Sequence, residues 1–391
     1  MVHLTRRSAL LGLTAAFGLG RASLAFADAQ TDQRFVVVIL RGALDGLAAV
    51  VPYGDPGLAT LRPGTQGPTP DGLLDLGGFY GLHPALANFH MMYAAGEMLP
   101  VHAVAGPYRI RSHFEAQDCL ESGADHRMTS GWLNRVVAAL PADTSRPEGE
   151  ALAIGVSVPL LLRGPAEVAN WAPHGFAMPQ ADLYARIAAL NAHDTVTGPA
   201  LAEGLRGRGF SEAVMQGVTP ETNRYAFPAL AAAAGRMLAA ADGPRIAALE
   251  LGGWDTHTAQ AARLTGPLHQ LDDGLAALKA GLGESWTRTA VLVMTEFGRT
   301  ARINGTGGTD HGTATVAFVL GGAIGGGRVV ADWPGLGAGK LFEDRDLAPT
   351  TDLRSVAKGL IAQQFGLTES VLTQVFPGSS GAAPMRGLLR A

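Results

Sequence analysis

Residues 34–46 read RFVVVILRGALDG, and this stretch indicates the fold of the chain. An uninterrupted apolar run rich in β-branched residues is typical of a parallel strand that is buried on both faces. The run ends in a glycine-containing turn, and Asp45 follows. We therefore predict a buried strand whose carboxyl end leads directly to an acidic side chain.

Similar apolar runs recur along the chain and alternate with helical patterns. Strands are expected at 99–105, 245–251, 289–295 and 314–322, and helices at 83–99, 112–123, 264–282 and 352–367. The helix at 264–282 carries leucines at helical spacing. Alternating strands and helices predict an α/β protein with a central, mostly parallel sheet. Residues 28–391 are expected to form one domain, with a less patterned insert around 140–245 that contains strands at 150–165 and helices at 179–193 and 228–241.

Length and composition exclude several classes of protein. The chain has 391 residues, 47% of them hydrophobic and 16% charged, which is enough for a large core. Its formal net charge of −4 gives no basic stripe, so no nucleic-acid partner is expected. Cys119 is the single cysteine, so no intramolecular disulfide can form. Because no basic group flanks it, Cys119 is interpreted as a buried structural residue.

The N-terminus has the features of an export signal. Arg6 and Arg7 precede a moderately apolar stretch rich in glycine and alanine, and an A-x-A cleavage pattern follows at 25–27. This resembles a twin-arginine signal spanning 1–27, although Ala9 stands where an aromatic residue is usual. The twin-arginine translocase is then a partner, and a periplasmic or secreted location follows. A lipid-anchoring helix is the alternative, but no stable membrane span is expected in the mature chain.

Acidic and histidine side chains follow the predicted strands where the strands end. They are Asp45, Asp255, His257, Glu296, Asp310 and His311. Because the carboxyl ends of parallel strands meet at one edge of a sheet, these side chains are expected to lie close together. Bare carboxylates at such an edge would repel, and a divalent cation such as zinc or manganese would relieve the repulsion with nitrogen and oxygen ligands.

Each residue also has an ordinary structural interpretation. Asp45 could cap the helix that follows it, Asp255 could bond local backbone amides, and Glu296 could pair with Arg299. Ser112 is expected to cap the helix at 112–123, with Glu115 in capping-box register. His113 follows Ser112 directly. It is interpreted as a residue that contacts the substrate or that hydrogen-bonds to a metal ligand without binding the metal itself.

The ordered motifs resemble the exported family known as domain of unknown function 1501, and more distantly the alkaline phosphatase and sulfatase superfamily. The motifs are RGALDGLAAVVPYGDP at 41–56, SHFEAQD at 112–118, GGWDTH at 252–257, TEFGRT at 295–300, GGTDHGT at 307–313 and DLRSVAKGL at 352–360. The superfamily resemblance implies a three-layer sandwich around a central sheet, two metal ions about 4 Å apart, and a serine or threonine nucleophile at a helix N-terminus.

The resemblance also implies roles for individual residues. Ser112 would be the nucleophile, while Asp255, His257 and His311 would bind one metal. Asp45 would bind the other, near Glu296.

Three departures accompany these roles. Asp255 and His257 are two apart where the superfamily has four, and Glu296-Phe297 replaces an Asp-His pair, so that Asp310 could substitute or one site could be empty. The third departure is that the sequence around Ser112 is not the usual nucleophile motif. The number of bound metal ions, one or two, is therefore left open by the sequence.

The sequence leaves three functions open, and the third is a different metal-dependent chemistry on an envelope polymer. The first is a metal-dependent hydrolase of phosphate or sulfate esters, acting on a small molecule or an envelope polymer. Ser112 and His113 would then lie at the reaction centre, and Arg109, Arg111 or Arg299 would bind the anionic group. The second is a catalytically degenerate metal-binding or accessory protein of the same fold.

Overall fold

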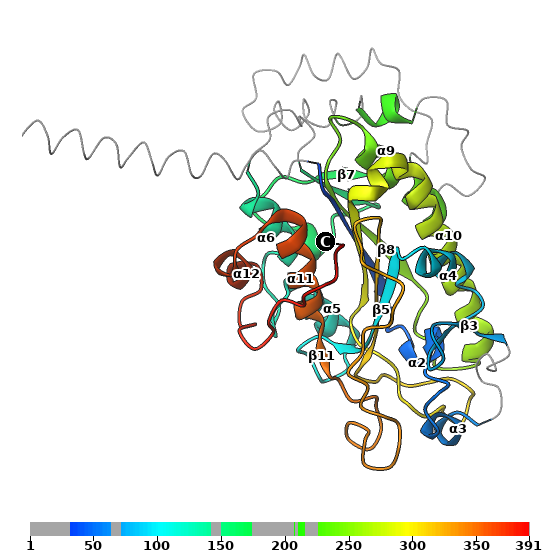
Figure 1. Cartoon of the computed structure of the whole chain (residues 1–391). Helices are drawn as coiled ribbons and strands as arrows, with labels where there is room; N and C mark the ends of the chain where they lie inside the picture. Colours follow the sequence, from blue (N-terminus) through cyan, green and yellow to red (C-terminus); the bar gives the residue numbers. More distant parts are fainter. Residues whose placement is uncertain are drawn as a thin grey trace, which may run out of the picture.

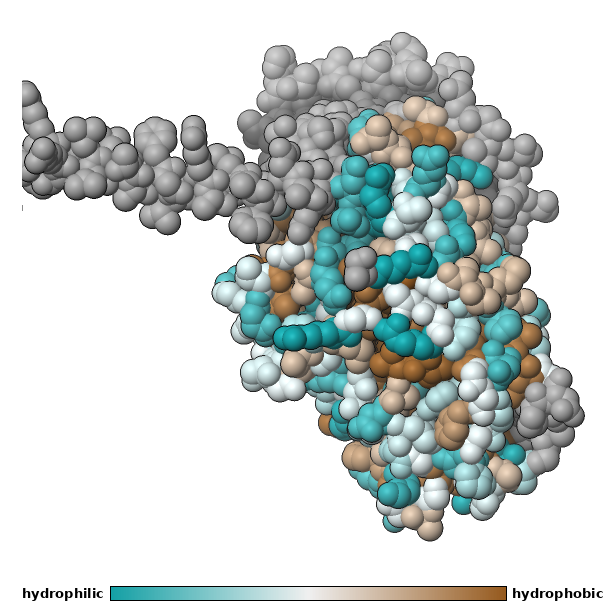
Figure 2. All heavy atoms as spheres, in the orientation of Figure 1, coloured by the Kyte–Doolittle hydropathy of each residue, from teal (hydrophilic) through white to brown (hydrophobic). Residues whose placement is uncertain are grey.

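A computed structural model describes residues 32–63, 72–141, 150–173, 207, 210–215 and 226–390 (Figure 1). The predicted signal at 1–27 and the predicted helix at 179–193 lie outside the described residues. None of the helices in the described ranges is long and apolar enough to cross a membrane. On the face of the molecule drawn in Figure 2, hydrophilic and hydrophobic side chains of the described residues are interspersed.

An eight-stranded sheet forms the centre of the molecule, in the order β11-β5-β10-β9-β1-β8-β6-β7. The strands are β1 (Arg34–Arg41), β5 (Met98–Ala105), β6 (Ala151–Ile154), β7 (Ala169–Trp171), β8 (Ile246–Gly252), β9 (Thr289–Thr295), β10 (Thr315–Leu320) and β11 (Thr351–Asp352). β1 pairs in parallel with both β8 and β9. Only β10 among these strands is antiparallel to its neighbours, which confirms the predicted α/β class with a mostly parallel sheet.

Side chains of β1 enter two separate hydrophobic clusters, one on each face of the sheet. The alternate residues Val36, Val38 and Leu40 belong to one cluster, and Phe35, Val37 and Ile39 to the other. All six are fully buried, as the uninterrupted apolar run predicts for a central strand. The molecule therefore has three layers, with the sheet in the middle.

Helices α4 (Ala87–Ala94), α9 (Phe227–Ala239) and α10 (Gln260–Leu282) cover one face of the sheet (Figure 1). The predicted leucine repeat lies on the buried side of α10, and it runs Leu264, Leu268, Leu271, Leu275, Leu278 and Leu282. α9 packs closely against α10, since a Cβ at Gly235 would approach the Leu278 carbonyl oxygen to 2.5 Å.

The opposite face is covered by α5 (His113–Ser122), α6 (Trp132–Ala139), α11 (Leu353–Phe365) and α12 (Glu369–Val375). α5 begins after Ser112 and ends at Gly123, whose φ of 66° gives the left-handed C-cap that the sequence indicates. The predicted capping box does not form, because Ser112 makes no side-chain cap bond and Glu115 instead accepts from the Tyr108 hydroxyl. Cys119 on this helix is buried and unpaired.

The direction of β10 determines where the segment 296–314 lies. Because β10 is antiparallel to β9, the chain leaves β9 and re-enters the sheet at the same edge. That edge also holds the carboxyl ends of β1, β5 and β8, since these strands run in the same direction as β9. Loops that are distant in sequence therefore meet at the carboxyl edge.

Smaller elements flank this edge. They are α2 (Gly46–Ala49), α3 (Gly57–Leu61) and a three-stranded sheet of β2 (Val50–Val51), β4 (Gly81–Leu82) and β3 (Leu74–Asp75). In the described part of 140–245, the prediction of strands at 150–165 is only partly confirmed. β6 forms, but after Pro159 the chain makes a short 3-10 helix, Leu160–Leu162, where proline cannot donate to a strand ladder.

Candidate metal centre

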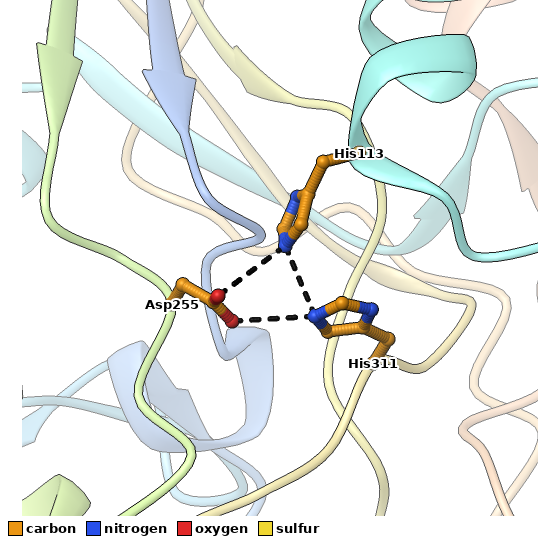
Figure 3. A group of neighbouring side chains, drawn as sticks. All are labelled: His113, Asp255 and His311. Carbon is orange, nitrogen blue, oxygen red and sulfur yellow. Dashed lines mark hydrogen bonds and ion pairs between the residues drawn. The ribbon is translucent and has the colours of Figure 1, made fainter.

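Three side chains from three distant segments meet at the carboxyl edge of the sheet (Figure 3). His113 is the first residue of α5, Asp255 follows β8, and His311 lies in the loop between β9 and β10. His113 Nε2 lies 3.0 Å from His311 Nε2 and 3.6 Å from Asp255 Oδ2, and His311 Nε2 lies 3.3 Å from Asp255 Oδ1. One atom from each residue lies within 4.8 Å of the other two, so the group could hold a metal ion.

His257 lies beside this group. Its Nε2 atom is 3.0 Å from Asp255 Oδ1 and 3.0 Å from His311 Nε2. We call His113, Asp255, His257 and His311 together the histidine–aspartate centre. The side chains of Asp255 and His257 are 44% and 42% exposed, so a ligand from solvent can reach the centre on that side.

Each imidazole of the centre has an acceptor at its other ring nitrogen. His113 Nδ1 is 2.7 Å from Glu296 Oε1, and His257 Nδ1 is 3.1 Å from Asp310 Oδ1. His311 Nδ1 is 3.0 Å from the backbone carbonyl oxygen of Arg111. Carboxylates and carbonyl groups can only accept, so each Nδ1 must carry a proton.

These bonds determine what the centre can hold. In a neutral imidazole with a protonated Nδ1, the Nε2 atom carries a lone pair. The Nε2 atoms of His113, His257 and His311 therefore turn lone pairs toward one another and toward the Asp255 carboxylate. Arg299 already places one positive charge beside Asp255 Oδ1, and the facing nitrogen lone pairs need further positive charge between them, either extra protons or a metal ion. Histidine ligands of metals usually donate their second N–H to a carboxylate or carbonyl in this way.

Glu296 is held behind His113. Its side chain is fully buried and its Oε1 atom accepts from the Gly42 amide, His113 and Gln117. Burial alone would raise the pKa of Glu296, but the bonds from His113 and Gln117 outweigh it and lower the pKa. The bond to Glu296 is also the main cause that raises the pKa of His113. Burial, together with the charge on His113, lowers the pKa of His311.

Arg299 is held behind Asp255. Its Nη1 lies 2.5 Å from Asp255 Oδ1, and its other nitrogens donate to the hydroxyl and carbonyl groups of Thr309. Burial opposes ionisation of Asp255, but Arg299 and the neighbouring histidines lower the pKa of its carboxyl group. Arg299 is 1% exposed, so it lies behind Asp255 and does not reach the surface.

Asp45 does not join the centre. It is the N-cap of α2, accepting from the Ala48 amide, and its carboxylate is buried. Arg62 Nη1 lies 2.9 Å from Asp45 Oδ2, and Gln260 donates to the same oxygen at 2.6 Å. The carboxylate is thus paired by a cation within the protein, which is the capping interpretation that the sequence left open.

The sequence placed Asp255, His257 and His311 on this edge, and the structure brings them together. Glu296 and Asp310 are near them, but they contact histidines instead of sharing the central space. His113 was expected beside the ligands and lies among them. Its position directly after the N-cap residue Ser112, which follows a strand and a short loop, is the signal that could have indicated this. Phe297 packs at ring-centroid distances of 4.9 Å from His113 and 5.3 Å from His311.

Comparison with known proteins identifies the family. The profile described as "Protein of unknown function (DUF1501)" matches residues 93–376, and the chain belongs to that family. No curated protein matches the chain. Among solved structures, the structure of BT1596, a 2-O GAG sulfatase, is similar to this chain with a TM-score of 0.33 and 10% sequence identity. The alignment covers 86% of this chain and 71% of the sulfatase chain. At that TM-score the similarity supports no conclusion about substrate or catalysis.

Proposed function

We propose that this member of the DUF1501 family is an exported, metal-dependent hydrolase of phosphate or sulfate esters. The observation that carries the proposal is the convergence of three imidazole Nε2 atoms on one carboxylate, with every Nδ1 bonded to an acceptor. His113, Asp255 and His311 would hold one divalent ion, and His257 would complete its coordination or face a group bound to it.

The donor set supports zinc, with manganese as a weaker alternative. Imidazole nitrogens combined with a carboxylate oxygen suit zinc, whereas manganese favours more oxygen ligands. In the described residues, Asp45 is paired with Arg62 and Glu296 with His113, so a second ion has fewer available ligands. We therefore propose one ion.

Ser112 is the proposed nucleophile. It lies between Arg111 and His113, both of which contact or form the centre, and its hydroxyl is not engaged in a helix cap. A bound divalent ion supplies positive charge that polarises an ester oxygen and lowers the pKa of a neighbouring hydroxyl group. The Ser112 oxygen would bond to phosphorus or sulfur as the bond to the alcohol oxygen breaks, and its proton would pass through solvent to the departing alcohol. Water would then hydrolyse the serine ester, which releases phosphate or sulfate and restores the hydroxyl group.

The surroundings of Ser112 support an anionic ester with an organic portion. Ile110 and Phe114 are 76% and 86% exposed and stand on either side of the segment 111–113, where they could contact the organic portion. Arg299 and Arg111 are paired with carboxylates. Arg109 instead donates to the carbonyl groups of Gly106 and Tyr108, and among the ion pairs of the described residues it has none, so we propose it for the anionic group.

One observation favours the second function, a metal-binding or accessory protein without turnover. The histidine–aspartate centre has four side chains, and four protein ligands would close a tetrahedral zinc site as in structural zinc sites. If His257 is a ligand, no position is left for substrate. If His257 is not a ligand, three protein ligands and an open position fit a catalytic site.

The proposed location rests on residues 1–27, which resemble a twin-arginine signal. Passage through the twin-arginine translocase would deliver a folded protein to the periplasm or beyond, with its metal already bound. A small molecule or an envelope polymer carrying an anionic ester would be the substrate there.

The test is metal analysis of the exported protein, followed by assays with phosphate and sulfate esters. About one zinc per chain is expected, and hydrolysis of one ester class should depend on it. Asp255→Ala and His311→Ala should lose the metal, with affinity at least 10–100-fold lower. His126→Ala is the matched control, because His126 is an exposed histidine that pairs with Asp125. Parent-like metal content in both centre variants would show that these residues are structural.

A further inference from the structure

The backbone at Arg111 is unusual and lies against the histidine–aspartate centre. Its φ of 63° is in the left-handed region, which costs energy for any residue with a side chain except in a few local contexts. In this conformation the Arg111 carbonyl oxygen accepts from His311 Nδ1 at 3.0 Å. The strained residue thus supplies the hydrogen bond that orients the His311 ring.

An ion pair anchors the side chain of this strained residue. Arg111 Nε and Nη2 lie 2.9 and 2.7 Å from Asp346 Oδ2, and Nη2 also lies 2.5 Å from Glu343 Oε2. Asp346 is fully buried, and within the described part of the chain its other oxygen has no hydrogen-bond partner but forms an ion pair with Arg345 Nη1 at 3.4 Å. Arg111 is therefore the main partner of a buried carboxylate, and losing it would leave that charge poorly compensated.

The same carboxylate also holds the loop that bears His311. Thr313, two residues after His311, donates its hydroxyl to Asp346 Oδ2 at 2.8 Å. One oxygen of Asp346 therefore binds both the segment that leads to His113 and the loop that carries His311. Because His113 and His311 are 198 residues apart in the sequence, this carboxylate ties together two segments that the chain does not join locally.

We propose that Arg111 and Asp346 are positioning residues for the metal centre. Their ion pair holds Arg111 in the left-handed conformation, so that its carbonyl group orients His311 and keeps the proton on Nδ1. The His311 Nε2 lone pair then faces His113 and Asp255. This inference rests on the proposed function, because it assigns a role toward the metal that the centre is proposed to bind.

Substitutions at Arg111 separate this role from ordinary stabilisation. Arg111→Ala removes the ion pair and leaves a residue that avoids the left-handed region, whereas Arg111→Gly removes the same ion pair but adopts that region readily. We expect alanine to lower the Zn²⁺ affinity about 10–100-fold, as do other losses behind a metal ligand. Glycine should retain clearly more of the affinity than alanine. Asp346→Asn, which keeps the shape of the side chain, should also weaken Zn²⁺ binding.

The affinity is measured on the full exported chain by competition with a chromophoric chelator, beside the visible spectrum of the Co²⁺-loaded protein. The spectrum should change in Arg111→Ala and Asp346→Asn, because it reports the arrangement of the ligands. Arg245→Ala is the matched control, since Arg245 forms a buried ion pair with Glu150 next to the first residue of β8, at the opposite edge of the sheet. It should lower the melting temperature without changing Zn²⁺ affinity or the spectrum.

Three results would overturn the inference, and they differ. A parent protein that binds no Zn²⁺ overturns the proposed metal centre and this inference with it. A parent that binds Zn²⁺, with Arg111→Ala and Asp346→Asn variants that match its affinity and spectrum, overturns the positioning role alone. Equal losses in Arg111→Gly and Arg111→Ala would also contradict it, because they would show that the guanidinium charge matters and the backbone conformation does not.

Discussion

Replacing Glu296 by glutamine should weaken metal binding while leaving the shape of the buried site intact. Glutamine has the same size, and its carbonyl oxygen can accept from His113, as Glu296 Oε1 does at 2.7 Å. Its amide group can donate to the Thr295 hydroxyl oxygen, which lies 2.9 Å from Glu296 Oε2. That oxygen can accept, because the Thr295 hydroxyl can donate its own proton to the Leu40 carbonyl oxygen. The substitution therefore removes chiefly the negative charge next to His113.

The magnitude follows from the role of that charge. A carboxylate behind a histidine ligand makes the imidazole more basic, and its loss typically costs about 10–100-fold in metal affinity. At a fixed free zinc concentration above the dissociation constant, this reduces the stabilisation by bound metal by about 1.4–2.7 kcal/mol. In the metal-free protein the change in the free energy of unfolding should be about 1 kcal/mol, the difference between charged and neutral hydrogen bonds.

Two measurements check this prediction. Chelator competition gives the zinc affinity, and NMR titration of the metal-free protein gives the pKa of His113, which should fall because Glu296 is the main cause that raises it. Glu250→Gln is the control, because Glu250 is a partly exposed carboxylate that pairs with Arg41. Parent-like zinc affinity together with an unchanged His113 pKa in Glu296→Gln would refute the reasoning.

Replacing Arg6 and Arg7 by lysine should retain the precursor in the cytoplasm, and undiminished periplasmic protein on immunoblots would contradict the twin-arginine route. Ser112→Gly should melt like the parent, because glycine caps helices almost as well as serine, yet lose activity on the order of a thousandfold or more if Ser112 is the nucleophile; parent-rate turnover would exclude that role. His102 is fully buried, donates to the Val50 carbonyl at 2.9 Å, and has a pKa lowered to about 4 by burial. The unfolded chain binds its proton near pH 6.5, so about 3 kcal/mol of stability should be lost as the pH falls from 6.5 to 4; denaturant unfolding of His102→Gln should show a shallower pH dependence, and an identical slope would contradict this assignment.

Much of the fold could be predicted because its signals are local. The apolar run at 35–40 is long enough and β-branched enough to indicate a central strand, and the leucine spacing in 264–282 indicates which side of that helix is buried. These patterns depend on hydrophobic burial and on the spacing of apolar residues, which repeats every two residues in a strand and about every 3.6 residues in a helix. Both can be seen within a short stretch of sequence. The prediction of strands over 150–165 is wrong after Pro159, because a local apolar run does not distinguish a strand from a short helical turn.

The order of residues along the chain places acidic and histidine side chains at the carboxyl edge, whereas the packing of the whole molecule sets which of them meet. Asp45 and Asp255 both follow parallel strands, yet Arg62 and Gln260 pair with Asp45, while Asp255 faces the histidines. His113 contacts His311, 198 residues away, because the sheet places antiparallel β10 between β5 and β9. Strand order and the direction of β10 result from packing of the whole core, and no local pattern of residues encodes them.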